Sequence, residues 1–254
     1  MKLTGNTIFI TGGTSGIGRG LAEALHRLGN KVIISGRRVG LLEEVTAANP
    51  GMASLVLDVT RLDSIQSVAQ ELVEKYPDIN VVFNNAGFMP FDDVSGPIDD
   101  VVAQELLATN LLGPIRMTSA LIEHLKAKPE ATILYTSSVL AFVPIAGNAL
   151  YSATKAALHS FAMSQRFQLR NTNVRVQEIA PPWVDTDLIY KSGDPRAMPL
   201  ADFIEQTLVA LATNEPEVIV DAIRLLRDNP GANEHVFVEA FNQSIVDNPI
   251  PVGA

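Results

Sequence analysis

The stretch NTIFITGGTSGIG (6–18) sets the architecture expected of this chain. Its apolar, β-branched start predicts a buried strand, and the sequence that follows predicts a helix with leucines at helical spacing. Glycines between a strand and a helix allow a tight turn and let a phosphate approach the helix N-terminus. The spacing Gly12-x-x-x-Gly16-x-Gly18 matches neither the commonest dinucleotide fingerprint nor a Walker loop. The turn therefore indicates a nucleotide site, although purely structural glycines give the same pattern.

Short apolar runs continue to alternate with longer helical patterns along the chain. Apolar strands without polar alternation are typical of a parallel sheet that helices cover on both faces. We therefore expect an α/β fold: a Rossmann-type, doubly wound parallel β-sheet flanked by helices, in a single domain spanning 1–254. The expected strands are 6–11, 31–35, 53–59, 79–85, 131–138 and 174–181, and the longest expected helices are 99–127 and 148–170.

The C-terminal part breaks this alternation, and no seventh strand is expected in it. Residues 182–200 are irregular and rich in proline, which predicts either a substrate lid over a pocket or a surface connection. Residues 201–254 are expected to form a helical C-terminal extension that includes a helix over 215–228. Earlier in the chain, Thr60 followed by Asp63 predicts a capping box for the third helix.

Composition excludes several classes of function. The chain has 254 residues, a net charge of −9 and a pI near 4.9, which is a poor match for nucleic acid or an anionic membrane surface. Because there is no cysteine, disulfides, thiolate nucleophiles and cysteine metal sites are excluded. The four histidines lack the spacing of metal ligands, so no metal is expected. No apolar run approaches the length of a membrane span, and a cytoplasmic protein is expected.

A second stretch, NALYSATKAALHS (148–160), places Tyr151 and Lys155 four residues apart, on one face of the expected helix. On a helix surface, a phenol ring at this spacing often simply covers the lysine stem. In a site, the ammonium would favour the ionised phenol and lower its pKa from about 10. A tyrosine tuned in this way can act as a general acid or base. The pair alone does not choose between these interpretations.

Six motifs that follow one another along the chain do decide between these interpretations. They are TGGTSGIG (11–18), LDV (57–59), NNAG (84–87), Asn110, SS (137–138) and YSATK (151–155). Together they resemble the classical branch of the short-chain dehydrogenase/reductase (SDR) family over residues 6 to about 186, and within it the chain is similar to reductases of the DltE type. The resemblance implies an oxidoreductase that binds a nicotinamide cofactor.

The resemblance also implies a role for each of four catalytic positions. Tyr151 corresponds to the catalytic acid/base, and Lys155 to the residue that lowers its pKa and binds the nicotinamide ribose. Ser138, rather than Ser137, corresponds to the serine that hydrogen-bonds the substrate oxygen. Asn110 corresponds to the asparagine that holds a water in a proton relay to the lysine.

The expected cofactor is NADP(H). NAD-specific sites commonly have an acidic residue at the end of the second strand, whereas this chain has Gly36 there, followed by Arg37. Arg37 can pair with a 2′-phosphate, and Arg38 either adds to this or is an ordinary solvated residue. Pro182 stands where the family usually has a glycine, which leaves the backbone path there open. The implied cofactor-binding residues are Gly12, Thr14, Ser15, Gly16, Ile17, Gly18, Arg37, Arg38, Asp58, Val59, Asn85, Ala86, Gly87, Asn110, Tyr151, Lys155, Pro181, Val184 and Thr186.

The leading prediction is an NADPH-dependent carbonyl reductase or alcohol dehydrogenase that acts on a small-molecule ketone, aldehyde or alcohol. Two alternatives stay open: an isomerase or dehydratase on the same scaffold, and a non-catalytic NADP-binding regulatory protein. Lys191 and Arg196 either meet an acidic group or are ordinary solvated charges. The expected substrate residues are Ser138, Leu140, Tyr151, Trp183, Leu188 and Tyr190, with Phe88, Met89, Phe142, Val143 and Ile189 adding to an apolar pocket.

A homodimer is expected from the family's usual assembly. Many relatives pair their two long helices, here about 99–127 and 149–170, in a four-helix bundle. These helices carry apolar residues on more than one face: Leu106, Leu107, Leu111, Leu112, Phe161, Phe167 and Leu169. Because no seventh strand is expected, we predict a twofold dimer and not a tetramer with two kinds of interface.

Overall fold

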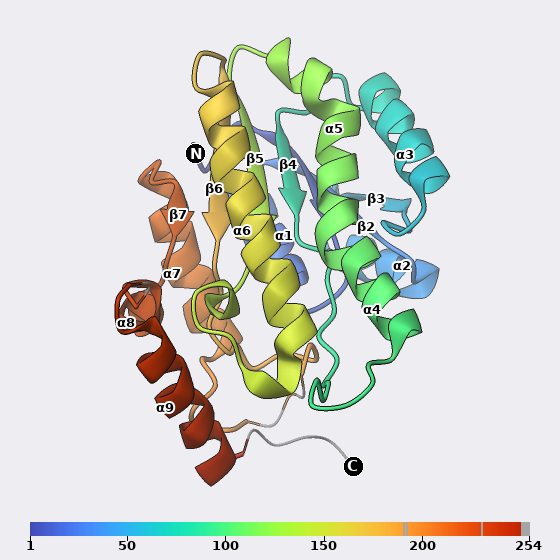
Figure 1. Ribbon diagram of the computed structural model, residues 1–254. Coiled ribbons are helices and arrows are strands. Elements are labelled where there is room, and N and C mark those ends of the chain that lie inside the picture. The colour runs from blue at the N-terminus through green and yellow to red at the C-terminus, as the bar shows by residue number, and fades with distance from the viewer. Residues whose placement is uncertain (190, 192, 230, 250–254) are drawn as a thin grey trace.

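The computed structural model describes residues 1–189, 191, 193–229 and 231–249. A seven-stranded parallel sheet, in the order β3-β2-β1-β4-β5-β6-β7, lies between two layers of helices (Figure 1). This arrangement confirms the predicted Rossmann-type doubly wound fold in a single domain. Within the described residues, no helix combines the length and apolar character needed to cross a bilayer.

The predicted strands are found at the expected places, with ends that differ by three residues at most. They are β1 (Thr7–Thr11), β2 (Lys31–Gly36), β3 (Ala53–Val56), β4 (Val81–Asn84), β5 (Ala131–Thr136) and β6 (Val174–Ile179). The helices are α1 (Gly16–Arg27), α2 (Val39–Ala48), α3 (Leu62–Lys75), α4 (Asp100–Leu107), α5 (Gly113–Lys126), α6 (Ala149–Leu169), α7 (Leu200–Ala212), α8 (Arg224–Arg227) and α9 (Glu234–Asp247). A π-helical turn, Ala108–Leu112, joins α4 to α5, so the predicted long helices are both confirmed.

The absence of a seventh strand was a wrong prediction. Glu217 and Val218 form β7, which pairs in parallel with Glu178 and Ile179 of β6. The predicted helix over 215–228 is correspondingly reduced to a 3₁₀ turn and the four-residue α8. Two residues carry no periodicity of their own, and they become a strand only because the edge of β6 offers hydrogen-bond partners.

The predicted capping box is also wrong. Helix α3 begins at Leu62, after an N-cap residue, Arg61, whose side chain makes no cap hydrogen bond. The hydroxyl and backbone N–H of Thr60 instead donate to Oδ1 of Asp58, at 2.7 and 3.0 Å. A carboxylate two residues upstream is the nearer acceptor, and it holds the turn between β3 and α3.

Side chains of the sheet alternate between two hydrophobic layers. Ile8 and Ile10 of β1 pack in the layer formed with α1, α2 and α7, whereas Phe9 between them packs with α3, α5 and α6. All three are fully buried. Burial on both faces explains why this strand is apolar without alternation.

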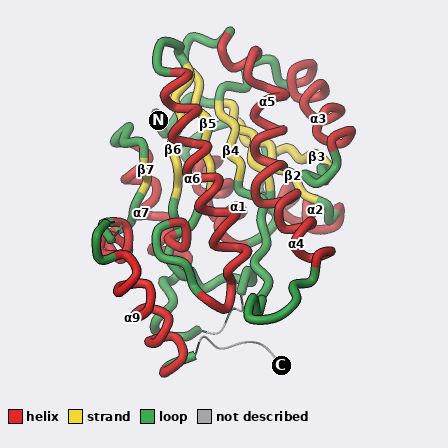
Figure 2. Tube along the Cα trace, in the orientation of Figure 1, coloured by secondary structure: helices red, strands yellow, loops and turns green. Residues whose placement is uncertain are grey.

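The carboxyl ends of the strands meet at one edge of the sheet, where the loops gather at the lower side of Figure 2. The strand order reverses between β1 and β4, and ligands of doubly wound sheets bind in the crevice at such a point. The loops after β1 and β4 contact each other there, because Nδ2 of Asn85 donates to the carbonyl of Gly12 at 3.2 Å.

Glycines let the loop after β1 pack this closely. A Cβ on Gly18 would lie 2.2 Å from the carbonyl oxygen of Gly12, and a Cβ on Gly12 would lie 2.8 Å from Cα of Ala86. Gly12 also has a φ of +69°, in the region that L side chains rarely adopt. Both positions therefore have a steric reason to be glycine.

Replacing Gly18 by alanine is expected to lower the free energy of unfolding by about 1–3 kcal/mol, because the new methyl group overlaps backbone atoms. Gly40→Ala is the matched control, since Gly40 is an exposed residue of α2 with no heavy atom within 4 Å of a new Cβ. We expect Gly40→Ala to be neutral or slightly stabilising. Urea unfolding measures both, and a Gly18→Ala midpoint equal to that of the wild type would contradict the close packing.

Candidate active site

One large cavity, of about 870 Å³, opens at the carboxyl edge of the sheet. Its walls come from the glycine loop, the ends of β2 to β5, the start of α6, the segment 182–200 and the C-terminal helix α9. Tyr151, Lys155 and Ser138 all line it. The cavity therefore places the residues predicted to be reactive next to the predicted nucleotide loop.

Tyr151 and Lys155 lie one turn apart on α6 and are both buried. The Lys155 ammonium donates a hydrogen bond to the carbonyl of Thr136, at the end of β5, over 2.7 Å. Its nitrogen lies 5.4 Å from the centroid of the Tyr151 ring. The hydroxyl of Ser138 accepts a hydrogen bond from the Leu140 N–H at 3.1 Å, and its side chain also interacts with the Tyr151 hydroxyl.

Burial dominates the electrostatics of this pair. It raises the pKa of Tyr151 to about 12, against an opposing interaction with the Ser138 side chain. It lowers the pKa of Lys155 to about 8, opposed by the Glu178 carboxylate. Burial thus acts against a lowered tyrosine pKa, and the lowering by Lys155 that the family resemblance implies stays a prediction. At neutral pH Tyr151 is a protonated phenol that can donate its proton.

Asn110 lies behind the cavity wall, near Lys155: a Cβ on Gly87 would lie 3.2 Å from its Oδ1 and 3.7 Å from the Lys155 ammonium. Asn110 is fully buried, and its neighbour Thr109 lines the cavity in its place. Its side-chain oxygen accepts from the Phe88 N–H at 3.1 Å, and its Nδ2 donates to the Phe88 carbonyl at 2.9 Å. Asn110 thus clamps the loop after β4, and its part in a water relay stays a prediction.

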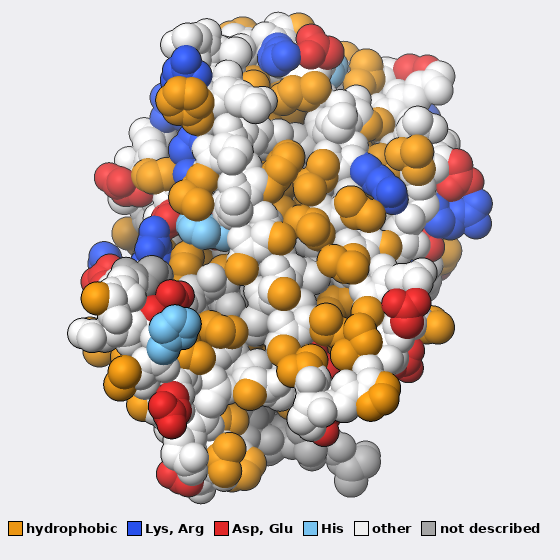
Figure 3. Space-filling model, viewed as in Figure 1, with side chains coloured by type: hydrophobic (Ala, Val, Ile, Leu, Met, Phe, Trp, Pro, Cys, Tyr) orange, Lys and Arg blue, Asp and Glu red, His pale blue; other side chains and the backbone are white. Residues whose placement is uncertain are grey.

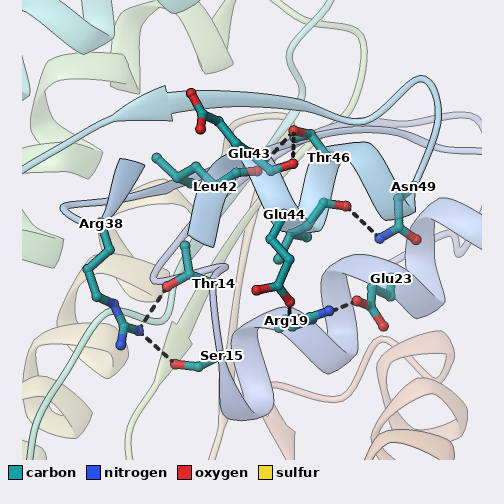
Figure 4. A network of polar contacts seen from close by, with 11 residues as sticks. Thr14, Ser15, Arg19, Glu23, Arg38, Leu42, Glu43, Glu44, Thr46 and Asn49 are labelled. Atoms are coloured by element: carbon teal, nitrogen blue, oxygen red, sulfur yellow. Dashed lines mark hydrogen bonds and ion pairs between the residues drawn. The ribbon is translucent and has the colours of Figure 1, made fainter. Parts of the chain in front are cut away.

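The guanidinium of Arg38 lies on the glycine loop (Figure 4). One terminal nitrogen of Arg38 donates to the hydroxyls of Thr14 and Ser15, at 3.1 and 3.2 Å. Arg37 is exposed, and its guanidinium lies 3.7 Å from the Glu105 carboxylate. Both arginines line the cavity, so the chain offers a positively charged pocket beside the loop.

These features fit a nicotinamide dinucleotide. The glycine cradle admits a backbone-bound phosphate, the arginines suit a second phosphate, and the cavity joins this end to Tyr151. Of the predicted cofactor residues, the ones that line the cavity are Gly12, Thr14, Ser15, Gly16, Ile17, Gly18, Arg37, Arg38, Asp58, Val59, Asn85, Ala86, Gly87, Tyr151, Lys155, Pro181, Val184 and Thr186.

The predicted substrate residues divide into three groups. Ser138, Leu140, Tyr151, Trp183 and Leu188 line the cavity, as do Phe88, Met89 and Ile189. Tyr190 lies outside the described residues. Phe142 and Val143 are buried in the core instead, which corrects their assignment to the pocket.

The ring of Phe142 packs beside two polar side chains of a partly buried network. It lies 5.1 Å from the His159 ring and 4.6 Å from the Arg227 guanidinium. His159, Glu178 and Glu217 bring possible metal-ligand atoms within 4.8 Å of one another. However, Arg227 binds both carboxylate oxygens of Glu217, at 2.6 and 2.8 Å. The guanidinium supplies the charge that a metal ion would bring, so this cluster is an ion-pair network.

Sequence reasoning missed the part of the wall that comes from the C-terminal region. Leu226, Phe241 and Ile245 line the cavity. Nothing in the local sequence places these residues near Tyr151, although the apolar stripe of α9 does indicate a covered face. Described residues of the segment 182–200, among them Trp183 and Leu188, line the cavity as well, and the movement of this segment as a lid stays a prediction.

Comparison with known proteins decides the family. A model of the short chain dehydrogenase family matches residues 6–196. This chain belongs to the short-chain dehydrogenase/reductase family. Among its SDR relatives, the uncharacterised oxidoreductase DltE of Bacillus subtilis (strain 168) is 37% identical over 248 residues, covering 95% of this chain and 98% of the relative. The predicted similarity to the DltE type is thereby confirmed. The NADP-dependent 3-hydroxy acid dehydrogenase of Schizosaccharomyces pombe is 32% identical over 258 residues, covering 93% of this chain and 98% of the relative.

Solved SDR structures share the whole fold. A short chain dehydrogenase from Burkholderia cenocepacia J2315 in complex with NADP superposes with a TM-score of 0.82 at 25% identity, covering 99% of this chain and 100% of that one. An SDR from Burkholderia phymatum in complex with NAD superposes with a TM-score of 0.81 at 19% identity, covering 100% of this chain and 99% of that one. At this identity the similarity shows the fold alone. The family thus establishes an oxidoreductase with a nicotinamide cofactor and does not choose between NADP and NAD.

Proposed function

We propose that this SDR is an NADP(H)-dependent carbonyl reductase or alcohol dehydrogenase for small-molecule ketones, aldehydes or alcohols. The observation that carries the proposal is the convergence of Tyr151, Lys155 and Ser138 on a cavity that continues to the glycine loop. A protonated, buried phenol suits a group that gives a proton to a developing alkoxide.

When bound there, the nicotinamide cofactor supplies the hydride that reduces the carbonyl carbon. As negative charge builds on the carbonyl oxygen, Ser138 donates a hydrogen bond to it and Tyr151 delivers its proton. Lys155, held by the Thr136 carbonyl, places positive charge beside the phenolate that remains. In the opposite direction the phenolate accepts the alcohol proton, and the same groups serve both reactions.

Tyr151→Phe tests the mechanism. The ring is kept and the proton donor is removed, so we expect turnover to fall on the order of a hundredfold or more. NADPH binding, followed by fluorescence titration, should be nearly unchanged. Near-normal turnover of a ketone panel by Tyr151→Phe would refute the assignment of Tyr151. If the wild type binds NADPH but consumes none of it with any ketone or aldehyde, the regulatory alternative is favoured.

NADP(H) preference is proposed from the basic pocket at the glycine loop. Gly36 ends β2 and lines the cavity beside this pocket, where it brings no carboxylate that would repel a 2′-phosphate. Arg38 already lies on the loop hydroxyls, which makes it a stronger candidate for the 2′-phosphate than the sequence alone indicated. The NADP named for the Burkholderia cenocepacia and Schizosaccharomyces pombe proteins supports the same preference.

Arg38→Ala is expected to raise the KM for NADPH about tenfold to a hundredfold, because a charge-assisted contact to the phosphate is lost. The KM for NADH should change little. Gly36→Asp combined with Arg37→Ala should move the preference further toward NADH. Arg170→Ala is a control, since Arg170 stacks on Phe167, away from the cavity. Wild-type efficiency with NADH that equals or exceeds that with NADPH would contradict this assignment.

The homodimer and the cytoplasmic location stay predictions. Leu107, Leu112, Met163 and Phe167 are exposed on α4 to α6, on the face that carries many hydrophobic side chains in Figure 3. Leu106 and Leu169, by contrast, are buried in the chain's own core. The sequence argument against a tetramer assumed no seventh strand. Because β7 exists, the dimer prediction now depends on the exposed helix face alone.

A further inference from the structure

The end of the cavity beyond Tyr151 is closed by one face of α9. Phe237, Phe241 and Ile245 recur at intervals of four on this helix and are the partly buried residues of its inner stripe, and the latter two line the cavity. Val246, directly beside Ile245, is 70% exposed. The helix therefore presents an apolar stripe to whatever occupies the cavity and a solvated face to water.

Two polar attachments hold α9 against the cavity. The side chain of Asn242 accepts from the Ala146 N–H and donates to the Pro144 carbonyl, so it binds the loop between Ser138 and α6. At the other end, Arg196 donates to the carbonyls of Asn248 and Pro249, at 2.6 and 2.9 Å. The apolar wall is thus a built part of the site.

The charges at this end disfavour an anionic substrate. Arg196 is the cation that lines the cavity here, and its Nε and NH2 bind the two oxygens of Asp194 at 3.0 and 2.8 Å. It also lies over the Trp183 ring, 5.3 Å from the centroid. Asp187, the other charged residue lining this part among the described residues, is exposed and anionic. A substrate carboxylate would have to displace Asp194 to gain a partner.

We propose, on the basis of the reductase function above, that the substrate is an uncharged carbonyl compound whose apolar tail lies against Phe241 and Ile245. Substrates that carry a carboxylate bind poorly, because the positive charge of the nearby Arg196 is already paired with the Asp194 carboxylate. The hydroxy acid named for the Schizosaccharomyces pombe relative belongs to the class of substrates that this geometry disfavours.

The test uses the full chain with NADPH and two substrate series. Straight-chain methyl ketones of increasing length should gain about fourfold in kcat/KM per added CH₂ until the cavity is filled. A keto acid and its methyl ester, otherwise identical, should differ at least tenfold in favour of the ester. A preference for the acid that is lost in Arg196→Gln would overturn the proposal.

Ile245→Ala and Val246→Ala form a matched pair. Ile245→Ala should lower kcat/KM about tenfold for long ketones and by a smaller factor for the shortest ketone, whereas Val246→Ala should resemble the wild type. Binding is measured independently through the fluorescence of Trp183, the single tryptophan, which lines the cavity. If ketone binding strengthens with chain length and weakens in Ile245→Ala, but no ketone is reduced, the proposed function fails and the pocket assignment stands. Equal effects of the two variants on binding would overturn the pocket assignment.

A separate observation concerns the N-terminus of α6. Oδ1 and Oδ2 of Asp92 accept from the N–H groups of Ala149 and Leu150, at 2.9 and 2.8 Å. Close by, the Asp92 N–H donates to the carbonyl of Gly147, and Nδ2 of Asn148 donates to the carbonyl of Pro90. The residue before α6 provides no side-chain cap, so the cap comes from a loop that is distant in sequence.

This cap lies directly before the reactive tyrosine. Tyr151 follows the two capped residues, and the loop that carries Asp92 also carries Phe88, which Asn110 clamps and which lines the cavity. The geometry points to Asp92 as a positioning residue for Tyr151, again on the basis of the reductase function. It ties one wall of the cavity to the helix that carries the acid/base.

Asp92→Ala should lower kcat on the order of tenfold and leave the dissociation constant of NADPH within twofold. Asp92→Asn keeps one acceptor and should recover most of kcat. Both variants remove a negative charge bonded to the first N–H groups of the helix that carries Tyr151. The rising limb of the pH profile for alcohol oxidation should therefore shift a few tenths of a unit to lower pH.

Asp93→Ala is the control in the same loop, because the Asp93 carboxylate binds only Ser95 among the described contacts. Amide hydrogen exchange of residues 149–155 should be faster in Asp92→Ala than in Asp93→Ala, whether or not any substrate is turned over. Equal exchange rates and equal pH profiles for the two variants would overturn the role of Asp92.

Discussion

The site depends on the burial of one cation. Lys155 is only 3% exposed, and its ammonium is held by the Thr136 carbonyl at the end of β5. A buried ammonium is costly unless hydrogen bonds and opposite charge compensate for lost hydration. Here the compensation comes from β5 and from the Glu178 carboxylate on β6. The position of α6 on the sheet and the charge beside Tyr151 are therefore set together, because a shifted helix would leave the ammonium unpaired.

Side-chain amides and a carboxylate join the segments that surround this cation. Asn85 links the loops after β1 and β4, Asn110 binds both backbone groups of Phe88, and Asp92 caps α6. Each of these bonds connects residues more than twenty positions apart. The walls of the cavity are thereby fastened to the elements that carry the reactive groups, and buried polar groups find their partners in the same contacts.

Prediction from sequence patterns succeeded where buried side chains produce a periodic pattern of apolar residues, and it failed where they do not. Six strands and the long helices were located because apolar runs and helical spacing extend over many residues. Strand β7 was missed since two residues form it only by pairing with β6. Phe142 was assigned to the pocket on its apolar character, yet it packs on His159 and Arg227. Phe241 was missed although it lines the cavity, because its helix arrives from the far end of the chain.

The sequence by itself determined the doubly wound fold, the SDR family and the positions of the glycine loop, Ser138, Tyr151 and Lys155. Each of these is written in a contiguous run whose local conformation follows from its residue types. Only the tertiary structure decided that Arg38 rather than Arg37 lies on the glycine loop, that Arg196 is ion-paired with Asp194, and that burial raises the pKa of Tyr151. Those outcomes depend on desolvation and on distances between segments far apart in sequence, which no local pattern records.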